Sequence, residues 1–390
     1  MQARGWHVWP MAAACLAASL PRGICAQEAN PFAPQGPSSR PAPVRDVLSS
    51  AQWATLERTV GRGLDWLARN QQADGSWYTL STGQPGVTAL CVLAFLSAGH
   101  EPGKGRHGAV IDRGLNYVLA AQHPDGLLAR HYPSMPMVSN NPSHTAIYNH
   151  AIAGLMLSEA FGMTHGQTHA QIRKTIEAAL GYTRQRQLDR KKWEGDLGGW
   201  RYVKPWPVSD SDLSVTSWQL MFLRSCRNAG FDVPAAHIDE AMAYVKRCYD
   251  PRSGRFLYAL YGENRRSSRG MTGAGILALS LGGLHGTEAA RTAGDWVLNH
   301  PYDQFNARVE YHDRFFYGAF YCSQGMFQLG GRYAAEFYPV LLRTLATHQQ
   351  ASGCWDAEAN IDEVYGNTYS TALAVLALTP PYQLLPIFQR

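Results

Sequence analysis

Three clusters of acidic residues, one of them with a histidine, are candidates for acid–base catalysis. The densest is Glu310, His312 and Asp313, which fits either an active-site loop or a solvated one. A second consists of Asp210 and Asp212, two carboxylic acids just before an apolar stretch. The third, Glu358, Asp362 and Glu363, precedes the last apolar stretch, where carboxylates suit the N-terminus of a helix. Structure alone therefore explains the third group.

Histidines and aromatic residues supply the remaining candidates. His131, His144 and His150 cluster in the sequence, but His144 and His150 are six residues apart, so they do not share a helix face as a metal-binding pair would. We expect no metal and no cofactor, since no P-loop or dinucleotide fingerprint is present. Five aromatic residues in apolar stretches either fill a core or line a cavity suited to an isoprenoid-like molecule: Tyr148, Trp218, Tyr317, Tyr321 and Tyr369.

Repetition in the sequence indicates how these residues are held. A glycine turn, often with an aromatic residue, recurs five times, as in Gln72–Trp77 and Gln350–Trp355. An amphipathic segment precedes each turn and a more apolar one follows it. The apolar segments align on one position, occupied by Thr88, Thr145, Thr216, Thr272, Tyr317 and Thr371 at intervals of 57, 71, 56, 45 and 54 residues. The tryptophans of the turns, at 77, 200 and 355, are predicted to wedge between helices.

Six amphipathic helices alternating with six apolar ones predict two concentric rings. A helix that is apolar all round must be buried, whereas an amphipathic helix can face water on one side. The sequence therefore predicts an all-α, (α/α)6 toroid over residues 48–390. Residues 1–26 have the pattern of a signal peptide and 27–47 that of a Pro/Ser-rich linker, so we expect export to the periplasm or the extracellular space.

Charge and cysteine content exclude some classes of partner and leave others open. A net charge of +5 without a Lys/Arg run argues against nucleic acid, and the apolar run in the leader is too short for a transmembrane anchor. Five cysteines follow the leader, and the sequence cannot pair them: Cys91, Cys226, Cys248, Cys322 and Cys354.

The aromatic turn and the spacing of the helix pairs resemble the prenyltransferase and squalene-cyclase repeat family, including secreted bacterial proteins with a single toroid and mostly unassigned activity. The resemblance implies a terpenoid-cyclase fold and an acid motif near Asp210 and Asp212. This sequence has Leu213 and Ser214 where that motif has its third acid and its threonine, so the motif is incomplete. Against the zinc pair of the prenyltransferases, Ser214 stands where a cysteine ligand is expected, which argues against zinc chemistry.

The repeat itself offers another role for Asp212. Four residues before each aligning position stand Gln84, Asn141, Asp212, Ser268, Asp313 and Asn367. Asn, Asp and Ser are favoured helix N-caps, so Asp212 is either a cap, an acid, or both. Whether the chain is an enzyme stays open at this stage.

Three functions are compatible with the sequence. The first is binding, with or without conversion, of an isoprenoid-like apolar ligand in the central cavity. The second is a non-catalytic scaffold for a protein or glycan partner. The third is a carbohydrate-active toroid enzyme, which needs two carboxylates across a groove; the available pairing is Glu310 or Asp313 with Glu358 or Asp362.

Overall fold

Two kinds of α-helix alternate along the chain in the computed structural model, which describes residues 30–33 and 47–389 apart from 206 and 359. Six helices have one exposed face: α1 (Ser50–Arg69), α3 (Gly108–Leu119), α5 (Gly166–Gln187), α7 (Ala235–Arg247), α9 (Glu288–Leu298) and α11 (Gly331–Thr347). Six others are largely or wholly buried: α2 (Gly86–Ser97), α4 (Pro142–Phe161), α6 (Leu213–Asn228), α8 (Arg269–Leu281), α10 (Phe315–Leu329) and α12 (Gly366–Leu378).

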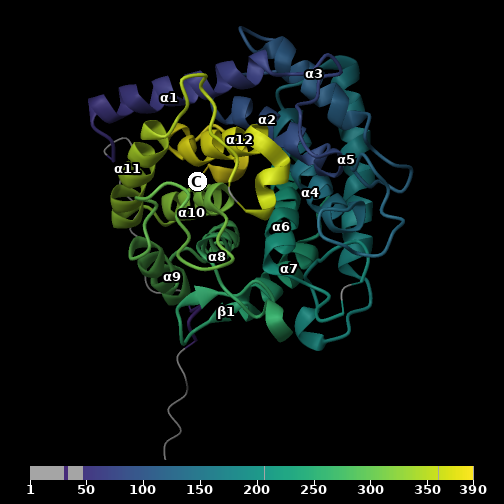
Figure 1. Ribbon diagram of the computed structural model, residues 1–390. Helices are drawn as coiled ribbons and strands as arrows, with labels where there is room; N and C mark the ends of the chain where they lie inside the picture. Colours follow the sequence, from purple (N-terminus) through teal and green to yellow (C-terminus); the bar gives the residue numbers. More distant parts are fainter. Residues whose placement is uncertain (1–29, 34–46, 206, 359, 390) are drawn as a thin grey trace, which may run out of the picture. The chain divides into compact units, whose positions relative to one another are not determined.

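The buried helices form a closed inner ring (Figure 1). Each packs on the next one along the chain, and α12 packs on α2. Each outer helix covers the inner helix before it, with α3 on α2 and so on round to α1 on α12. The predicted (α/α)6 toroid is therefore confirmed. The strands of the described residues, β1 (Tyr249–Asp250) and β2 (Arg255–Phe256), form one antiparallel pair in the turn after α7.

Tryptophan turns join three of the outer helices, α1, α5 and α11, to the next inner helix. The indole Nε1 of Trp77 donates to the carbonyl of Leu67 near the end of α1 at 2.7 Å, and its backbone N–H donates to the hydroxyl of Thr88 in α2 at 3.3 Å. The same two bonds recur at Trp200 and Trp355. All three indoles are buried in the core, as expected for wedges between helices.

Glycine in these turns lets the backbone approach the neighbouring outer helix. A Cβ on Gly75 would lie 2.3 Å from the carbonyl oxygen of Arg113 in α3, and φ at Gly75 is +89°. At Gly353, where the last turn meets the first helix, a Cβ would lie 2.4 Å from the carbonyl oxygen of Arg62. Only glycine combines this conformation with this contact, so the turn sequence helps to close the ring.

The predicted capping positions act as caps in three of six inner helices. The side chains of Asn141, Asp212 and Ser268 accept backbone N–H bonds at the start of α4, α6 and α8. Asp313 does not cap α10, because both its oxygens bind Arg269; the Glu358 carboxylate accepts the first N–H groups of α10 instead. Gln84 and Asn367 bind turn residues.

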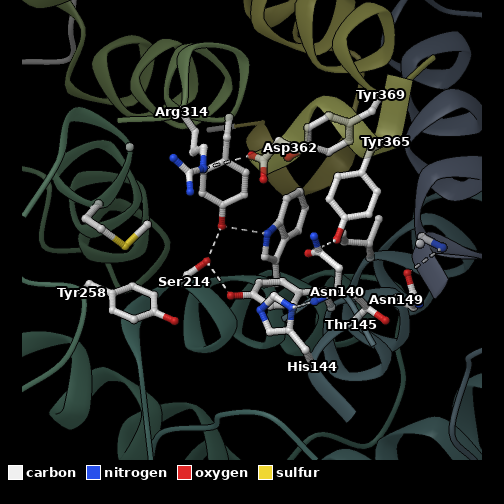
Figure 2. A pocket seen from close by; sticks show the side chains of 18 of the residues that line it. Asn140, His144, Thr145, Asn149, Ser214, Tyr258, Arg314, Asp362, Tyr365 and Tyr369 are labelled. Atoms are coloured by element: carbon white, nitrogen blue, oxygen red, sulfur yellow. Dashed lines mark hydrogen bonds and ion pairs between the residues drawn. The ribbon is translucent and has the colours of Figure 1, made fainter. Parts of the chain in front are cut away.

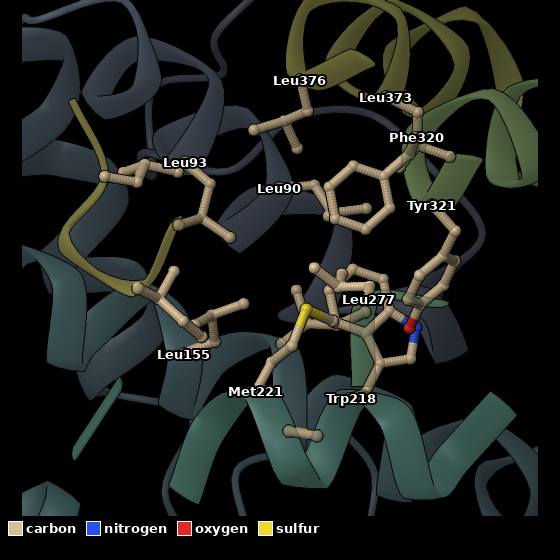
Figure 3. Packing of buried hydrophobic residues seen from close by; sticks show 14 of the residues in the cluster. Leu90, Leu93, Leu155, Trp218, Met221, Leu277, Phe320, Tyr321, Leu373 and Leu376 are labelled. Atoms are coloured by element: carbon tan, nitrogen blue, oxygen red, sulfur yellow. The ribbon is translucent and has the colours of Figure 1, made fainter. Parts of the chain in front are cut away.

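Apolar side chains fill the middle of the ring (Figure 3). They come from all six inner helices and are almost wholly buried, among them Leu93, Leu155, Met221, Leu277, Phe320 and Leu376. The C-terminal segment, with η6 (Pro380–Tyr382) and η7 (Pro386–Phe388), packs on α10 and α6. There the Glu159 carboxylate accepts the N–H of Ile387 at 3.3 Å. The interior of the ring is therefore a packed core at this level.

Little of the predicted leader and linker belongs to the part of the chain that the structure describes. Residues 1–26 and most of 27–47 lie outside the described residues; within 30–33, Phe32 packs edge-on against Tyr249 at 5.7 Å. The five cysteines after the leader are buried free thiols, so no disulfide joins them. Among the helices that the structure describes, none is long and apolar enough to cross a bilayer.

Candidate functional site

A cavity of about 220 Å³ opens where the N-terminal ends of the inner helices converge. Every inner helix contributes residues from its first three turns, and the loops before the helices supply the rest. Its apolar lining consists of Val87, Leu90, Ile152 and Met271, and its aromatic lining of Tyr148, Tyr202, Trp218, Tyr258, Tyr317, Tyr365 and Tyr369. Charged and imidazole groups come from His144, Arg266, His312, Arg314 and Asp362. Amide and hydroxyl groups come from Asn140, Thr145, Asn149, Ser214, Ser267 and Ser268. The surface of the cavity is therefore mainly apolar and aromatic, with polar groups distributed among these side chains.

Four of the five predicted aromatic residues stand on the cavity wall: Tyr148, Trp218, Tyr317 and Tyr369. Tyr321 lies behind them, fully buried, with its ring centroid 5.5 Å from Trp218 in an edge-on contact. Its place one turn further along α10 puts it into the packed core instead of the cavity.

The polar ends of this aromatic wall bind one another (Figure 2). The hydroxyl oxygens of Tyr317 and Ser214 are 2.6 Å apart, Tyr148 donates to Ser214 at 3.1 Å, and the indole of Trp218 donates to Tyr317 at 3.1 Å. Because these groups satisfy each other, the surface that they leave for a ligand is mainly ring and hydrocarbon.

Asp362 and Arg314 form an ion pair at the wall, with 3.4 Å between the Nε of Arg314 and an oxygen of Asp362 (Figure 2). Asp362 lies in η5 (Ile361–Tyr365), just before α12. Burial raises the pKa of Asp362 to about 7 against the opposing effect of Arg314, and nearby Glu358 raises it further. A carboxyl group with this pKa exchanges protons near neutral pH, which suits a general acid or base.

The two predicted acids, Asp210 and Asp212, do not line the cavity. One oxygen of Asp212 accepts the N–H of Val215 at 2.8 Å; the other has no hydrogen bond and lies 3.6 Å from the guanidinium of Arg201. Burial raises the pKa of Asp212 to about 6, opposed by Arg201. Asp210 accepts the N–H of Lys192 in the long loop before α6.

Of the acidic residues considered for glycan chemistry, all except Asp362 are engaged in ion pairs or helix capping away from the cavity. Glu310 pairs with Arg255, Asp313 pairs with buried Arg269, and Glu358 caps α10. The structure therefore brings no second carboxylate to Asp362 among the described residues of the cavity.

The three histidines considered for a metal site lie in different environments. His144 reaches the cavity wall, and burial together with Arg201 lowers its pKa to about 4. His150 is a core residue that accepts the N–H of Leu128. His131 is exposed. No three His, Cys, Asp or Glu side chains in the described ranges lie close enough together to hold a metal ion.

The chain matches no protein-family model and no curated protein, but solved structures resemble it over most of its length. The type II terpene cyclase MstE from Scytonema, in complex with geranylgeranyl dihydroxybenzoate, has a TM-score of 0.56 and 12% identity, covering 86% of this chain and 100% of that one. An unsaturated glucuronyl hydrolase specific for heparin has a TM-score of 0.58 and 11% identity, covering 85% and 97%. A glycosidase has a TM-score of 0.54 and 15% identity, covering 87% and 100%.

The chain has a terpenoid-cyclase-like toroid fold. At these identities the likeness concerns the fold alone, and it is shared by enzymes that act on isoprenoid and on carbohydrate substrates. The contents of the cavity must therefore decide between these functions.

Sequence reasoning missed several residues of the site. Arg266, Arg314, Tyr202 and Tyr258 line the cavity but received no role, and Asp362 was considered for helix electrostatics and as one half of a carboxylate pair. All five lie between an outer and an inner helix. A signal did exist: in a toroid these loops gather at one end of the ring, so polar residues a few positions before each inner helix share one neighbourhood.

Proposed function

We propose that this protein binds an isoprenoid-like molecule in the cavity at the N-terminal ends of the inner helices. The observation that carries the proposal is the wall itself, with seven aromatic and four aliphatic side chains around about 220 Å³. An engineered cavity of about 150 Å³ holds benzene, so this volume takes a hydrocarbon segment of about nine or ten carbons. That is the size of a C10 isoprenoid or of one end of a longer one.

The arrangement of acids supports this function over a two-carboxylate glycosidase. Glycoside hydrolysis of that type needs a second carboxyl group about 5 to 10 Å from the first. Within the described part of the cavity Asp362 is the one carboxylate, and the groups that could have paired with it are bound to arginines or cap α10. Most hydroxyl and amide groups of the wall are likewise hydrogen-bonded within the protein, among them those of Tyr148, Asn149 and Ser267.

Asp362 is proposed as the proton donor of the site. A carboxyl group with a raised pKa is a weaker acid than an ordinary one, so it is poorly suited to protonate an isolated alkene. It suits transfer to an oxygen, or to a double bond made electron-rich by an attached oxygen. Asp212, whose pKa is also raised, has no access to the cavity.

Calorimetric titration of the full chain with geraniol tests the binding. We expect saturable binding that Met271→Trp weakens at least about tenfold, because an indole at this lining position occupies the cavity. Met135→Trp is the matched control, since Met135 is 62% exposed on the loop before α4. Thermal unfolding of both variants checks that they fold; Ile152→Phe, a smaller insertion at the same wall, replaces Met271→Trp if that variant does not.

Mass spectrometry of a solvent extract gives an independent reading. A co-purifying isoprenoid in the wild type that is lost in Met271→Trp supports the proposal. Absence of geraniol binding, or equal binding by Met271→Trp and the wild type, contradicts it. For the acid, Asp362→Asn should keep geraniol binding within about threefold and abolish any product that the wild type forms from the extracted ligand. If the wild type forms none, Asp362 loses this role and binding stands.

A further inference from the structure

One side of the cavity carries more positive than negative charge. The guanidinium of Arg266 lies on the wall, and among the described residues no carboxylate comes within 4.0 Å of it. Its contacts are the Nε2 of His312 at 3.2 Å and the ring of Tyr258, 5.4 Å from the guanidinium carbon. An arginine at a largely apolar cavity without an anionic partner keeps most of its hydrogen-bonding capacity available to a ligand.

His312 connects Arg266 with the second arginine of the wall. Burial and the charges of Arg266 and Arg314 lower the pKa of His312. The imidazole therefore stays neutral and accepts a hydrogen bond from Arg266 at Nε2. The neutral imidazole adds no charge of its own, and all three residues line the same cavity.

Asp362 is the one carboxylate on the described cavity wall; Glu310, which also acts on His312, pairs with Arg255, and Glu358 caps α10. Asp362 pairs with Arg314, and its pKa of about 7 means that a substantial fraction of it is protonated at neutral pH. The N-terminal ends of the inner helices, which border the same cavity, add the positive ends of their dipoles. The wall around Arg266 and Arg314 is therefore electropositive, opposite in character to the hydrocarbon wall.

We propose that Arg266 and Arg314 form an anion subsite, and that the isoprenoid-like ligand of this protein carries a carboxylate or phosphate group. The inference rests on the proposed function and deepens it. The hydrocarbon part lies against Trp218, Tyr317 and their neighbours, while the anionic oxygens take the free N–H donors of Arg266. A planar guanidinium binds two oxygens of such a group at once, which fixes the orientation of the ligand.

A matched pair of C10 probes, geranic acid and geraniol, isolates the anionic group. Calorimetric titration at pH 6.5 keeps geranic acid ionised while much of Asp362 is protonated. We expect geranic acid to bind about 10- to 100-fold more tightly than geraniol, the range for hydrogen bonds to a charged group. Geranyl monophosphate, titrated alongside, distinguishes a phosphate from a carboxylate preference.

Two arginine variants locate the effect. Arg266→Gln should remove most of the preference for geranic acid while leaving geraniol binding within about threefold. Arg265→Gln is the control, because Arg265 is adjacent in the chain but exposed and absent from the cavity. Retention of the full preference in Arg266→Gln, or an equal loss in both variants, would overturn the subsite.

The outcomes separate this inference from the proposed function. If geraniol and both anions bind with equal affinity, the anion subsite is refuted and the apolar site remains. If none of the three probes binds to a folded wild-type protein, the proposed function itself fails. If phosphate alone, as inorganic phosphate, binds as tightly as the geranyl compounds, the hydrocarbon wall plays no part and the isoprenoid assignment is wrong.

Discussion

Replacing Asp212 by asparagine separates its capping role from its charge. In the wild type the nitrogen of Val215 lies 2.8 Å from one carboxylate oxygen of Asp212, and asparagine keeps a carbonyl oxygen there to accept its N–H. The substitution removes the ionisable group, whose other oxygen lies 3.6 Å from the guanidinium of Arg201. The amide nitrogen then faces Arg201 in place of an oxygen. That exchange lowers the stability of the variant by an amount that does not depend on pH.

The pH dependence of the difference follows from burial. The pKa of Asp212 rises from 3.8 to about 6 in the folded protein. Because the folded state binds the proton more tightly than the unfolded state, the stability of the wild type falls as pH increases through this range. The loss is about 3 kcal/mol, and it is complete above pH ~7. Asp212→Asn cannot lose it, so we expect the variant to gain about 3 kcal/mol relative to the wild type between pH ~3.5 and 7.

Urea unfolding followed by circular dichroism at several pH values between 3.5 and 7.5 measures this gain. Asp212→Ala serves as the control: it removes the cap as well as the charge, so it should follow the same pH dependence with a further loss of about 1 kcal/mol throughout. A constant difference between the wild type and Asp212→Asn over this range would refute the reasoning. It would mean that attraction to Arg201 and the hydrogen bond from Val215 balance desolvation, so that the pKa of Asp212 does not change on folding.

Three further predictions concern the scaffold. Gly275→Ala should lower the free energy of unfolding by about 1–3 kcal/mol, because the added Cβ would lie 2.2 Å from the ring of Phe256. Gly61→Ala should raise it by about 0.5–1 kcal/mol, because a Cβ there would have no other atom within 4 Å. Urea unfolding compares the two variants. Thr371→Val leaves a buried N–H unpaired and should cost about 1–3 kcal/mol in the same assay. Burial raises the pKa of Glu159 to about 7, so its stabilising effect is full at acidic pH and is lost as pH rises through 7. The protection of the C-terminal amides against hydrogen exchange, measured relative to their intrinsic rates at each pH, should fall there, and Glu159→Gln should suppress the fall.

The architecture could be predicted from the sequence because the same helix-pair pattern recurs along the chain. Burial of a whole helix requires an apolar sequence on every face, and all twelve residues of α2 are buried. The turn motif adds a second, independent signal, since glycine and tryptophan are each required by a contact that recurs round the ring. An irregular repeat can be aligned with the regular ones, so the ring could be recognised although the fifth helix pair lacks the turn.

The candidate site could not be predicted in the same way, because its charged residues occur once each. Asp313 and Asp212 occupy the same position of the repeat, yet one binds Arg269 and the other caps its own helix. The loop before each inner helix determines whether the aspartate caps the helix or binds another residue, and these loops differ in length and sequence. The placement of Arg266 beside His312 likewise depends on two loops from successive repeats.

The repeat and the cavity are nevertheless linked through the position on which the inner helices align. In the copies with a tryptophan turn, the threonine there is wholly buried, binds the turn and stays off the cavity wall, as at Thr371. The second turn has Leu128 in place of tryptophan, the fourth has Phe256, and the fifth copy has no such turn. Of the three aligned residues in these copies, Thr145 and Tyr317 line the cavity, whereas Thr272 is wholly buried and stays off the wall. A position that no longer binds a tryptophan turn can therefore contact a ligand, so breaks in the repeat are where function should be sought in this fold.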